Sequence, residues 1–342
     1  MKRSSSWRQV AVISIIAIFA LGYILPMFKG CNTEDTPPTP VATPKAMIQA
    51  PDFAADTAYA AVAKQVSFGP RVTNSASHKA CKAWLVKQFK SYGAEIIEQN
   101  FTAKRYDGVA LNGTNIIARF NPSVPNRVML SSHWDSRHIA DKDANKANQT
   151  KPILGADDGA SGVGILVEVA RTIKNNPISI GVDIVLFDAE DYGDPKGEDE
   201  ASLTTWCLGA QHWAKNPHVA GYQARFGILL DMAGAKDARF ALEGISMQAA
   251  PEIMKKVWNI GQRLGYGNFF VSEPSQGTTD DHYYVNQYGI PMIDIINRMP
   301  DGNFAPYHHT QNDNLSIIDT RTLKAVGQTV LAAIYNEANT SF

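Results

Sequence analysis

The chain has 342 residues, of which 44% are hydrophobic and 19% charged, so it holds enough apolar material for one large or two modest globular domains. Lys and Arg number 32 against 33 Asp and Glu, and the net charge of -1 gives no electrostatic reason to expect a nucleic-acid partner. A small molecule or the end of a peptide is the more suitable class of substrate.

The first 30 residues differ from the rest of the chain. Basic residues near the N-terminus precede an uncharged stretch from Val10 to Phe28, which is typical of a signal peptide or a membrane anchor. Gly30 and Cys31 resemble a bacterial lipoprotein processing site, which Lys29 fits poorly. Lipid attachment at Cys31, an uncleaved anchor and a cleaved signal are three alternatives. Each predicts an exported bacterial protein of the periplasm or cell envelope, and the first two attach it to the membrane.

Residues 31–49 are rich in Pro and Thr and poor in apolar side chains. Such a segment is expected to be an extended, solvated linker that holds a folded domain away from a membrane. The chain has three cysteines and no CxxC motif, which argues against a zinc site made of thiolates. Cys81 and Cys207 either pair or are separate buried thiols, and the oligomeric state is not predicted.

From residue 50 onward, helical and extended patterns alternate. Apolar residues at helical spacing predict helices over about 81–92, 163–173 and 253–264. Extended runs at 114–120, 127–132, 180–187 and 226–230 predict strands, and the last three are nearly continuous apolar segments typical of buried parallel strands. This order predicts a single α/β domain over residues 50–342, with a central mixed, mostly parallel β-sheet flanked by helices.

Polar side chains follow the predicted strands at the points where they end. In open α/β sheets, functional groups gather beyond the carboxyl ends of the strands. One acid after a strand is usually an ordinary strand exit, but several together predict a functional site. These residues are His133 and Asp135, Glu190 and Asp191, Asp231, and Asp294.

Carboxylates and imidazoles in this set suit a catalytic zinc ion, which takes O and N donors and keeps one position open. Asp158 lies in a Gly-rich turn, where capping of the following helix by Asp157 or Asp158 is the alternative. Asp191 is preceded by Glu190, and adjacent acids point in different directions, so one can bind metal while the other carries protons. His309 lies in a polar loop, and its neighbour His308 leaves the assignment ambiguous by one residue.

Seven motifs occur in a characteristic order across the predicted domain. The motifs are Phe68-Gly-Pro-Arg71, His133-Trp-Asp-Ser136, Gly155-Ala-Asp-Asp158, Leu186-Phe-Asp-Ala-Glu-Asp191, Leu229-Leu-Asp-Met-Ala-Gly234, Asp280-Asp-His282 and His309-Thr310. In that order, the chain resembles the glutaminyl cyclases (glutaminyl-peptide cyclotransferases), especially bacterial members that look like animal ones, within the zinc aminopeptidase-like superfamily. The resemblance implies the fold of that superfamily and the cyclisation of N-terminal glutamine of peptides to pyroglutamate with release of ammonia.

The resemblance also implies roles for single residues. One zinc ion would be bound by Asp158, Asp191 and His309, although the family often has Glu at the position of Asp191. Glu190 matches the general acid/base. Two further acids, Asp231 and Asp280, match its supporting residues.

Three further expectations concern the surroundings of the metal. The family pattern implies a cis peptide bond between Asp158 and Gly159, which costs about 3–4 kcal/mol outside proline. The Trp206 and His308 rings are expected to form walls of the substrate pocket. Residues 137–152 are polar and predict a surface loop near the mouth of the site.

The main rival is an aminopeptidase of the same superfamily with two zinc ions. In that hypothesis His133 and Asp231 bind the second ion, Asp158 bridges, and Glu190 activates a water. The motif at Asp280 and the segments 206–209 and 232–235 resemble the cyclases, whereas Asp294 stands where animal cyclases have His. A non-catalytic binding domain is a third possible class. Such a domain would be expected to lack one of the metal ligands or the general acid/base residue.

Overall fold

A six-stranded mixed sheet forms the centre of the computed structural model, which describes residues 46–197 and 199–342. Strand β3 pairs in parallel with β4 and β5, and β5 pairs in parallel with β8, while β1–β2 and β2–β4 are antiparallel. The prediction of a mixed, mostly parallel sheet is therefore confirmed. In the order β1-β2-β4-β3-β5-β8, the strands span Glu95–Lys104, Ala110–Phe120, Gly181–Phe187, Arg127–His133, Gly227–Asp231 and Met292–Ile296. A small second sheet pairs β6 (Phe240–Leu242) with β7 (Phe270–Pro274).

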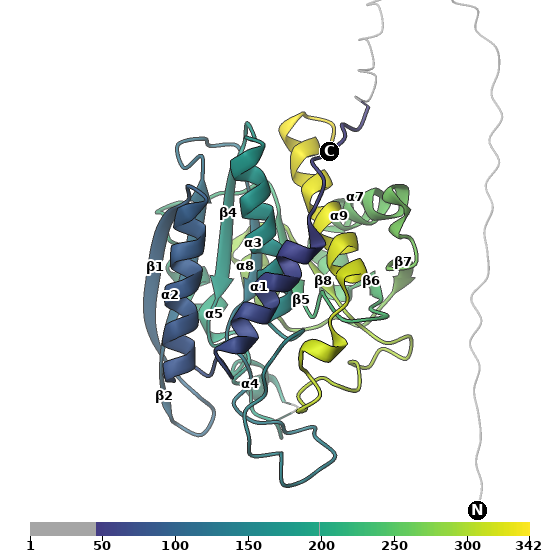
Figure 1. Cartoon of the computed structure of the whole chain (residues 1–342). Helices are drawn as coiled ribbons and strands as arrows, with labels where there is room; N and C mark the ends of the chain where they lie inside the picture. The colour runs from purple at the N-terminus through teal and green to yellow at the C-terminus, as the bar shows by residue number, and fades with distance from the viewer. Residues whose placement is uncertain (1–45, 198) are drawn as a thin grey trace, which may run out of the picture. The chain divides into compact units, whose positions relative to one another are not determined.

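Helices cover both faces of the central sheet (Figure 1). One face carries α1 (Ala55–Ser67), α2 (Ala76–Ser91), α3 (Ala160–Asn175), α7 (Pro251–Gly261) and α9 (Thr320–Ala338), whose apolar residues belong to the larger core cluster. The other face carries α5 (Leu208–Lys215) and α8 (Asp281–Tyr288). The shorter elements are α4 (Glu200–Leu203), α6 (Gly244–Ala249), the π-helical turn η1 (Gln262–Tyr266) and the 3-10 turn η2 (Leu315–Ile317).

Strand β3 shows why the predicted apolar runs become central strands. All seven of its residues are buried, and successive side chains alternate between the two cores: Val128 and Leu130 enter the larger cluster and Met129 the smaller one. At its first residue, Arg127 donates to the Asp183 carboxylate at 2.6 Å and 2.7 Å. At its last residue, His133 reaches the carboxyl edge of the sheet, where the predicted site residues lie.

The structure decides three local points that the sequence predicted or left open. Gly159 is the N-cap of α3 and no side chain caps that helix, so the capping hypothesis for Asp157 or Asp158 is wrong. The helix predicted to run to residue 264 ends at Gly261, because the chain widens into the π-helical turn and Gly265 has a positive φ of 89°. Cys81 and Cys207 are both free and buried, which rules out their pairing.

The signal or anchor predicted for residues 1–30, the lipid site predicted at Cys31 and most of the predicted linker lie outside the described residues. Within residues 46–197 and 199–342, we find no helix that combines the length and the apolar character needed to cross a membrane.

Candidate metal centre

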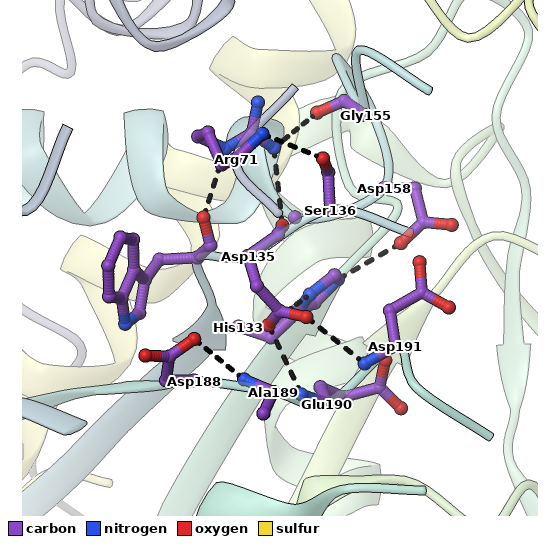
Figure 2. A network of polar contacts seen from close by, with 12 residues as sticks. Arg71, His133, Asp135, Ser136, Gly155, Asp158, Asp188, Ala189, Glu190 and Asp191 are labelled. Carbon is purple, nitrogen blue, oxygen red and sulfur yellow. Dashed lines mark hydrogen bonds and ion pairs between the residues drawn. The ribbon is translucent and has the colours of Figure 1, made fainter. Parts of the chain in front are cut away.

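Four chain segments bring acids and imidazoles together at the carboxyl edge of the sheet, and Figure 2 shows two of them, those with His133 and with Glu190 and Asp191. His133 is the last residue of β3, Glu190 and Asp191 follow β4, and Asp231 is the last residue of β5. The fourth segment is the loop after β8, which contains the two adjacent histidines. Parallel strands end at the same edge, so residues far apart in the chain meet there.

Asp158 enters the site from a turn that needs two glycines. Gly155 and Gly159 have φ of 58° and 94°, and a Cβ at Gly159 would lie 2.8 Å from the Asp135 carbonyl oxygen. The described peptide bonds are all trans, including Asp158–Gly159, so the expected cis bond is wrong. The positive φ at Gly159 turns the chain there instead, without the cost of a non-proline cis bond.

The three predicted ligands face one another across a short gap. His309 Nε2 lies 3.2 Å from Asp191 Oδ1 and 3.7 Å from Asp158 Oδ2. All three residues are buried, and Asp158 Oδ2 and Asp191 Oδ2 have no hydrogen-bond partner. Two buried carboxylates with unused oxygens are costly unless a cation neutralises them. The donor set of two carboxylates and one imidazole therefore fits a zinc ion.

The contacts of the other ring nitrogens distinguish His309 from His308. Burial, His309 and Lys142 together hold the pKa of His308 well below its usual value, so the ring is neutral. Its Nδ1 lies 3.1 Å from Lys142 Nζ, a donor, so the ring proton belongs on Nε2, the atom that faces Asp158 at 3.9 Å. His309 Nδ1 instead faces Asp141 Oδ1 at 3.4 Å, an ion-pair contact without full hydrogen-bond alignment. A carboxylate behind Nδ1 leaves Nε2 of His309 free to bind a metal.

A second group of possible ligands lies on the other side of Asp158. His133 Nε2 is 3.0 Å from Asp158 Oδ1 and 3.2 Å from Asp231 Oδ1. Behind it, Nδ1 of His133 is 3.5 Å from Asp135 Oδ1. The structure therefore brings together the residues of the second-metal hypothesis as well, with Asp158 shared between the two groups.

The Glu190 carboxylate has a polar partner that none of the three ligands shares. Its Oε1 accepts a hydrogen bond from Cys207 Sγ at 3.4 Å, and Glu190, Cys207 and Asp280 lie within 4.8 Å of one another through their polar atoms. Burial, together with neighbouring carboxylates, raises the pKa of Glu190 well above its usual value. Burial and the Asp231 charge likewise raise the pKa of Asp280 to about 7. Asp191 differs: burial opposes its ionisation, but His309 and Arg137 outweigh burial and lower its pKa.

A cavity of about 430 Å³ opens onto these groups. Trp206 and His308 both line it, together with Leu203 and Phe304. Two pairs of aromatic rings stack beside the cavity. The ring centroids of Phe304 and His308 are 4.0 Å apart, and those of Trp206 and His309 are 5.9 Å apart with an angle of 12° between the ring planes. The pocket thus combines ionisable groups with a partly apolar wall.

The loop predicted at the surface contributes residues that sequence reasoning missed. Arg137 is fully buried and its Nη1 lies 3.1 Å from Asp191 Oδ1. It also forms a short ion pair with Asp141, which is the residue behind His309. The only sequence signal was the placement of these charges soon after the motif at His133.

The chain belongs to peptidase family M28, whose model matches residues 115–334. Among solved structures, a glutaminyl cyclase from Bacteroides thetaiotaomicron is 48% identical with a TM-score of 0.82, and the match covers 84% of this chain and 99% of that one. A glutaminyl cyclase from Tannerella forsythia is 50% identical with a TM-score of 0.81 and the same coverage. A Zn-dependent exopeptidase from Parabacteroides distasonis is also 50% identical, with a TM-score of 0.82 and the same coverage.

A curated relative from Drosophila melanogaster, a glutaminyl-peptide cyclotransferase, is 23% identical over an alignment of length 280 that covers 74% of this chain and 73% of the relative. These matches confirm the resemblance to glutaminyl cyclases that the ordered motifs indicated.

Proposed function

We propose that the chain is a zinc-dependent glutaminyl-peptide cyclotransferase, which closes the N-terminal glutamine of a peptide to pyroglutamate. One observation carries the proposal: Asp158, Asp191 and His309 line the same cavity as Glu190, whose pKa is raised by burial. The similarity to bacterial glutaminyl cyclases supports it. Asp158, Asp191 and His309 would hold one zinc ion.

The reaction forms one bond and breaks one. The α-amine nitrogen of the peptide attacks the carbon of its own γ-carboxamide, a C–N bond of the lactam forms, and the original C–NH₂ bond breaks with loss of ammonia. Zinc bound in the centre supplies Lewis acidity toward the carboxamide oxygen. No water is consumed, so the chain has to exclude water rather than activate it.

Glu190 is the proposed proton carrier. It takes a proton from the attacking amine and delivers it to the departing amide nitrogen, which is favoured by a carboxyl pKa raised toward neutrality. Asp231 and Asp280 are the proposed supporting acids, because the Asp231 charge raises the pKa of Asp280 and Asp280 in turn raises that of Glu190. The rings of Trp206 and His308 are proposed as walls against which the glutamine side chain packs.

A dinuclear aminopeptidase is the second candidate function, because His133 lies within 3.2 Å of both Asp158 and Asp231 and the three could bind a second metal ion. The similarity to an exopeptidase is compatible with it. The two functions differ in product: ammonia and a blocked N-terminus for the cyclase, a free amino acid for the peptidase.

The test is a zinc count on the purified chain, run alongside assays of ammonia and free amino acid from the same Gln-initiated peptide. One zinc per chain and ammonia release are expected. Two zinc ions with free glutamine would identify the peptidase, and the absence of any turnover would favour a binding domain. The variant His133→Ala further separates the cyclase from the peptidase, because the cyclase should keep its single zinc ion whereas the peptidase should lose one of its two zinc ions.

The cellular setting follows from the N-terminal sequence. We propose that residues 1–30 direct export in a bacterium as a signal peptide or anchor, that 31–49 form a linker, and that 50–342 act in the periplasm or cell envelope. The substrates are then the N-termini of exported peptides or proteins. Labelling of intact cells with an impermeant reagent, compared with lysed cells, tests this location.

A further inference from the structure

The turn that carries Asp158 is held between a buried cation and a buried carboxylate. The residues are Arg71 from the segment after α1, and Asp313 from the loop that contains His309. Both side chains are fully buried, and both act on the backbone of the turn. Neither has a part in the chemistry described above.

Arg71 binds the carbonyl side of the turn. Its Nη1 donates to the Leu154 carbonyl at 2.6 Å and its Nη2 to the Gly155 carbonyl at 2.8 Å. From the same guanidinium, Nε donates to the Trp134 carbonyl at 2.9 Å, and Nη2 also reaches the Asp135 carbonyl at 3.3 Å. Figure 2 shows the guanidinium between the two segments. One planar fork therefore joins the end of β3, after His133, to the start of the turn.

Asp313 binds the amide side. Its Oδ1 accepts from the Asp157 N–H at 2.8 Å and its Oδ2 from the Asp158 N–H at 3.2 Å. The cation thus meets carbonyl oxygens and the anion meets N–H groups, so the charges match the two ends of the peptide dipoles. Because Asp313 follows His309 by four residues, it also ties the turn to the histidine loop.

The site is completed by Asp135, whose carboxylate accepts from the Glu190 N–H at 3.1 Å and the Asp191 N–H at 3.2 Å. The segments that carry Asp158 and Asp191 are thus joined through backbone hydrogen bonds to the buried side chains of Arg71, Asp313 and Asp135, and Figure 2 shows those of Arg71 and Asp135. The turn packs closely against its neighbours, because a Cβ added at Gly155 would lie 3.0 Å from Arg71 Nη2 and 2.8 Å from Ser136 Cβ.

We propose that Arg71 and Asp313 are positioning residues that set the place of Asp158 relative to His133 on one side and His309 on the other, and thereby set the affinity for zinc. The inference rests on the metal centre of the proposed function. Residues that orient metal ligands typically change metal affinity about 10–100-fold when replaced. A residue that only stabilises the fold would lower the melting temperature without this change.

The variants are Arg71→Lys, which keeps the charge but loses the fork, and Asp313→Asn, whose amide has one acceptor oxygen for two N–H donors. Arg127→Lys is the matched control, because Arg127 is also buried and also donates to backbone carbonyls, in addition to the Asp183 carboxylate, but lies at the opposite end of β3. For each full-length protein, the zinc dissociation constant is measured by competition with a chromogenic chelator. The melting temperature of the metal-free protein is recorded beside it.

Arg71→Lys and Asp313→Asn should each weaken zinc binding about 10–100-fold. Arg127→Lys should melt at a lower temperature yet bind zinc within about two-fold of wild type. Wild-type affinity in the folded Arg71 and Asp313 variants would overturn the inference, as would an equal loss in the control. If Arg71→Lys does not fold, Asp313→Asn decides alone. A wild-type chain that binds no zinc would instead refute the metal centre and the proposed function with it.

Discussion

Replacing the carboxylate of either of two adjacent acids, Glu190 and Asp191, by the matching amide should stop the reaction for two different reasons. In Glu190→Gln, the amide keeps the size of the side chain and a partner for Cys207, but it can no longer accept a proton. General acid/base groups contribute about 10²–10⁴-fold to rate, so the barrier should rise by about 3–5 kcal/mol. The zinc content should stay at the wild-type value, because the contacts of Glu190 are with Cys207 rather than with His309.

The matched change is Asp191→Asn, one residue further along the chain. Its carboxylate faces His309 at 3.2 Å, so the amide should weaken or abolish zinc binding and lose activity for that reason. Zinc per chain is measured by elemental analysis, and ammonia release from a Gln-initiated peptide is followed at saturating substrate. The two variants should therefore have similar low activity and different metal content.

The reasoning fails if Glu190→Gln turns over at the wild-type rate, since no other group has been given the proton. It fails equally if Glu190→Gln loses zinc while Asp191→Asn keeps it. That result would mean that the directions of the two adjacent side chains had been exchanged.

Three further predictions concern other residues. His309→Ala should lose zinc while His308→Ala retains it and raises KM, because Lys142 occupies Nδ1 of His308; elemental analysis with steady-state kinetics decides, and zinc loss in His308→Ala would reverse the assignment. Gly159→Ala should lower the free energy of unfolding by about 2 kcal/mol or more, since φ is 94° and the Cβ would contact Asp135, and a denaturant titration equal to wild type would contradict this. For Glu243, burial opposes ionisation, but His282 and its other hydrogen-bond donors lower its pKa from 4.5 to about 2. The stability that its carboxylate provides is present above pH 4.5 and is lost as the pH falls toward 2, so acid unfolding should be steeper in wild type than in Glu243→Gln.

Much of the fold could be predicted because the central strands are buried on both faces. Strands β3 and β4 are nearly continuous apolar segments in the sequence, and the structure has them within a residue or two of the predicted bounds. Strand β1 was not predicted, because it lies at the edge of the sheet and most of its side chains are exposed or half-buried. Helix α9 was also missed: fifteen of its residues are buried, so it lacks the polar face that helical periodicity depends on.

The candidate site was predictable by residue type and only partly by arrangement. Acids after strands indicated where Asp191 and Asp231 would lie, because parallel strands end at one edge. The choice between His308 and His309 depends on Lys142 and Asp141, which lie more than 150 residues earlier in the chain. The motif ending in Arg71 was visible, but its role was not, because its partners are backbone carbonyls that carry no sequence signal.

The large separation of Asp158 and His309 in the sequence affects the stability of the fold as well as catalysis. An ion held by both would act as a cross-link that closes most of the second half of the domain into a loop, and the chain could not unravel without releasing it. Each tenfold rise in free zinc above the dissociation constant would then add about 1.4 kcal/mol to the resistance against unfolding. Metal supply would thus govern how stable the folded molecule is, through mass action alone.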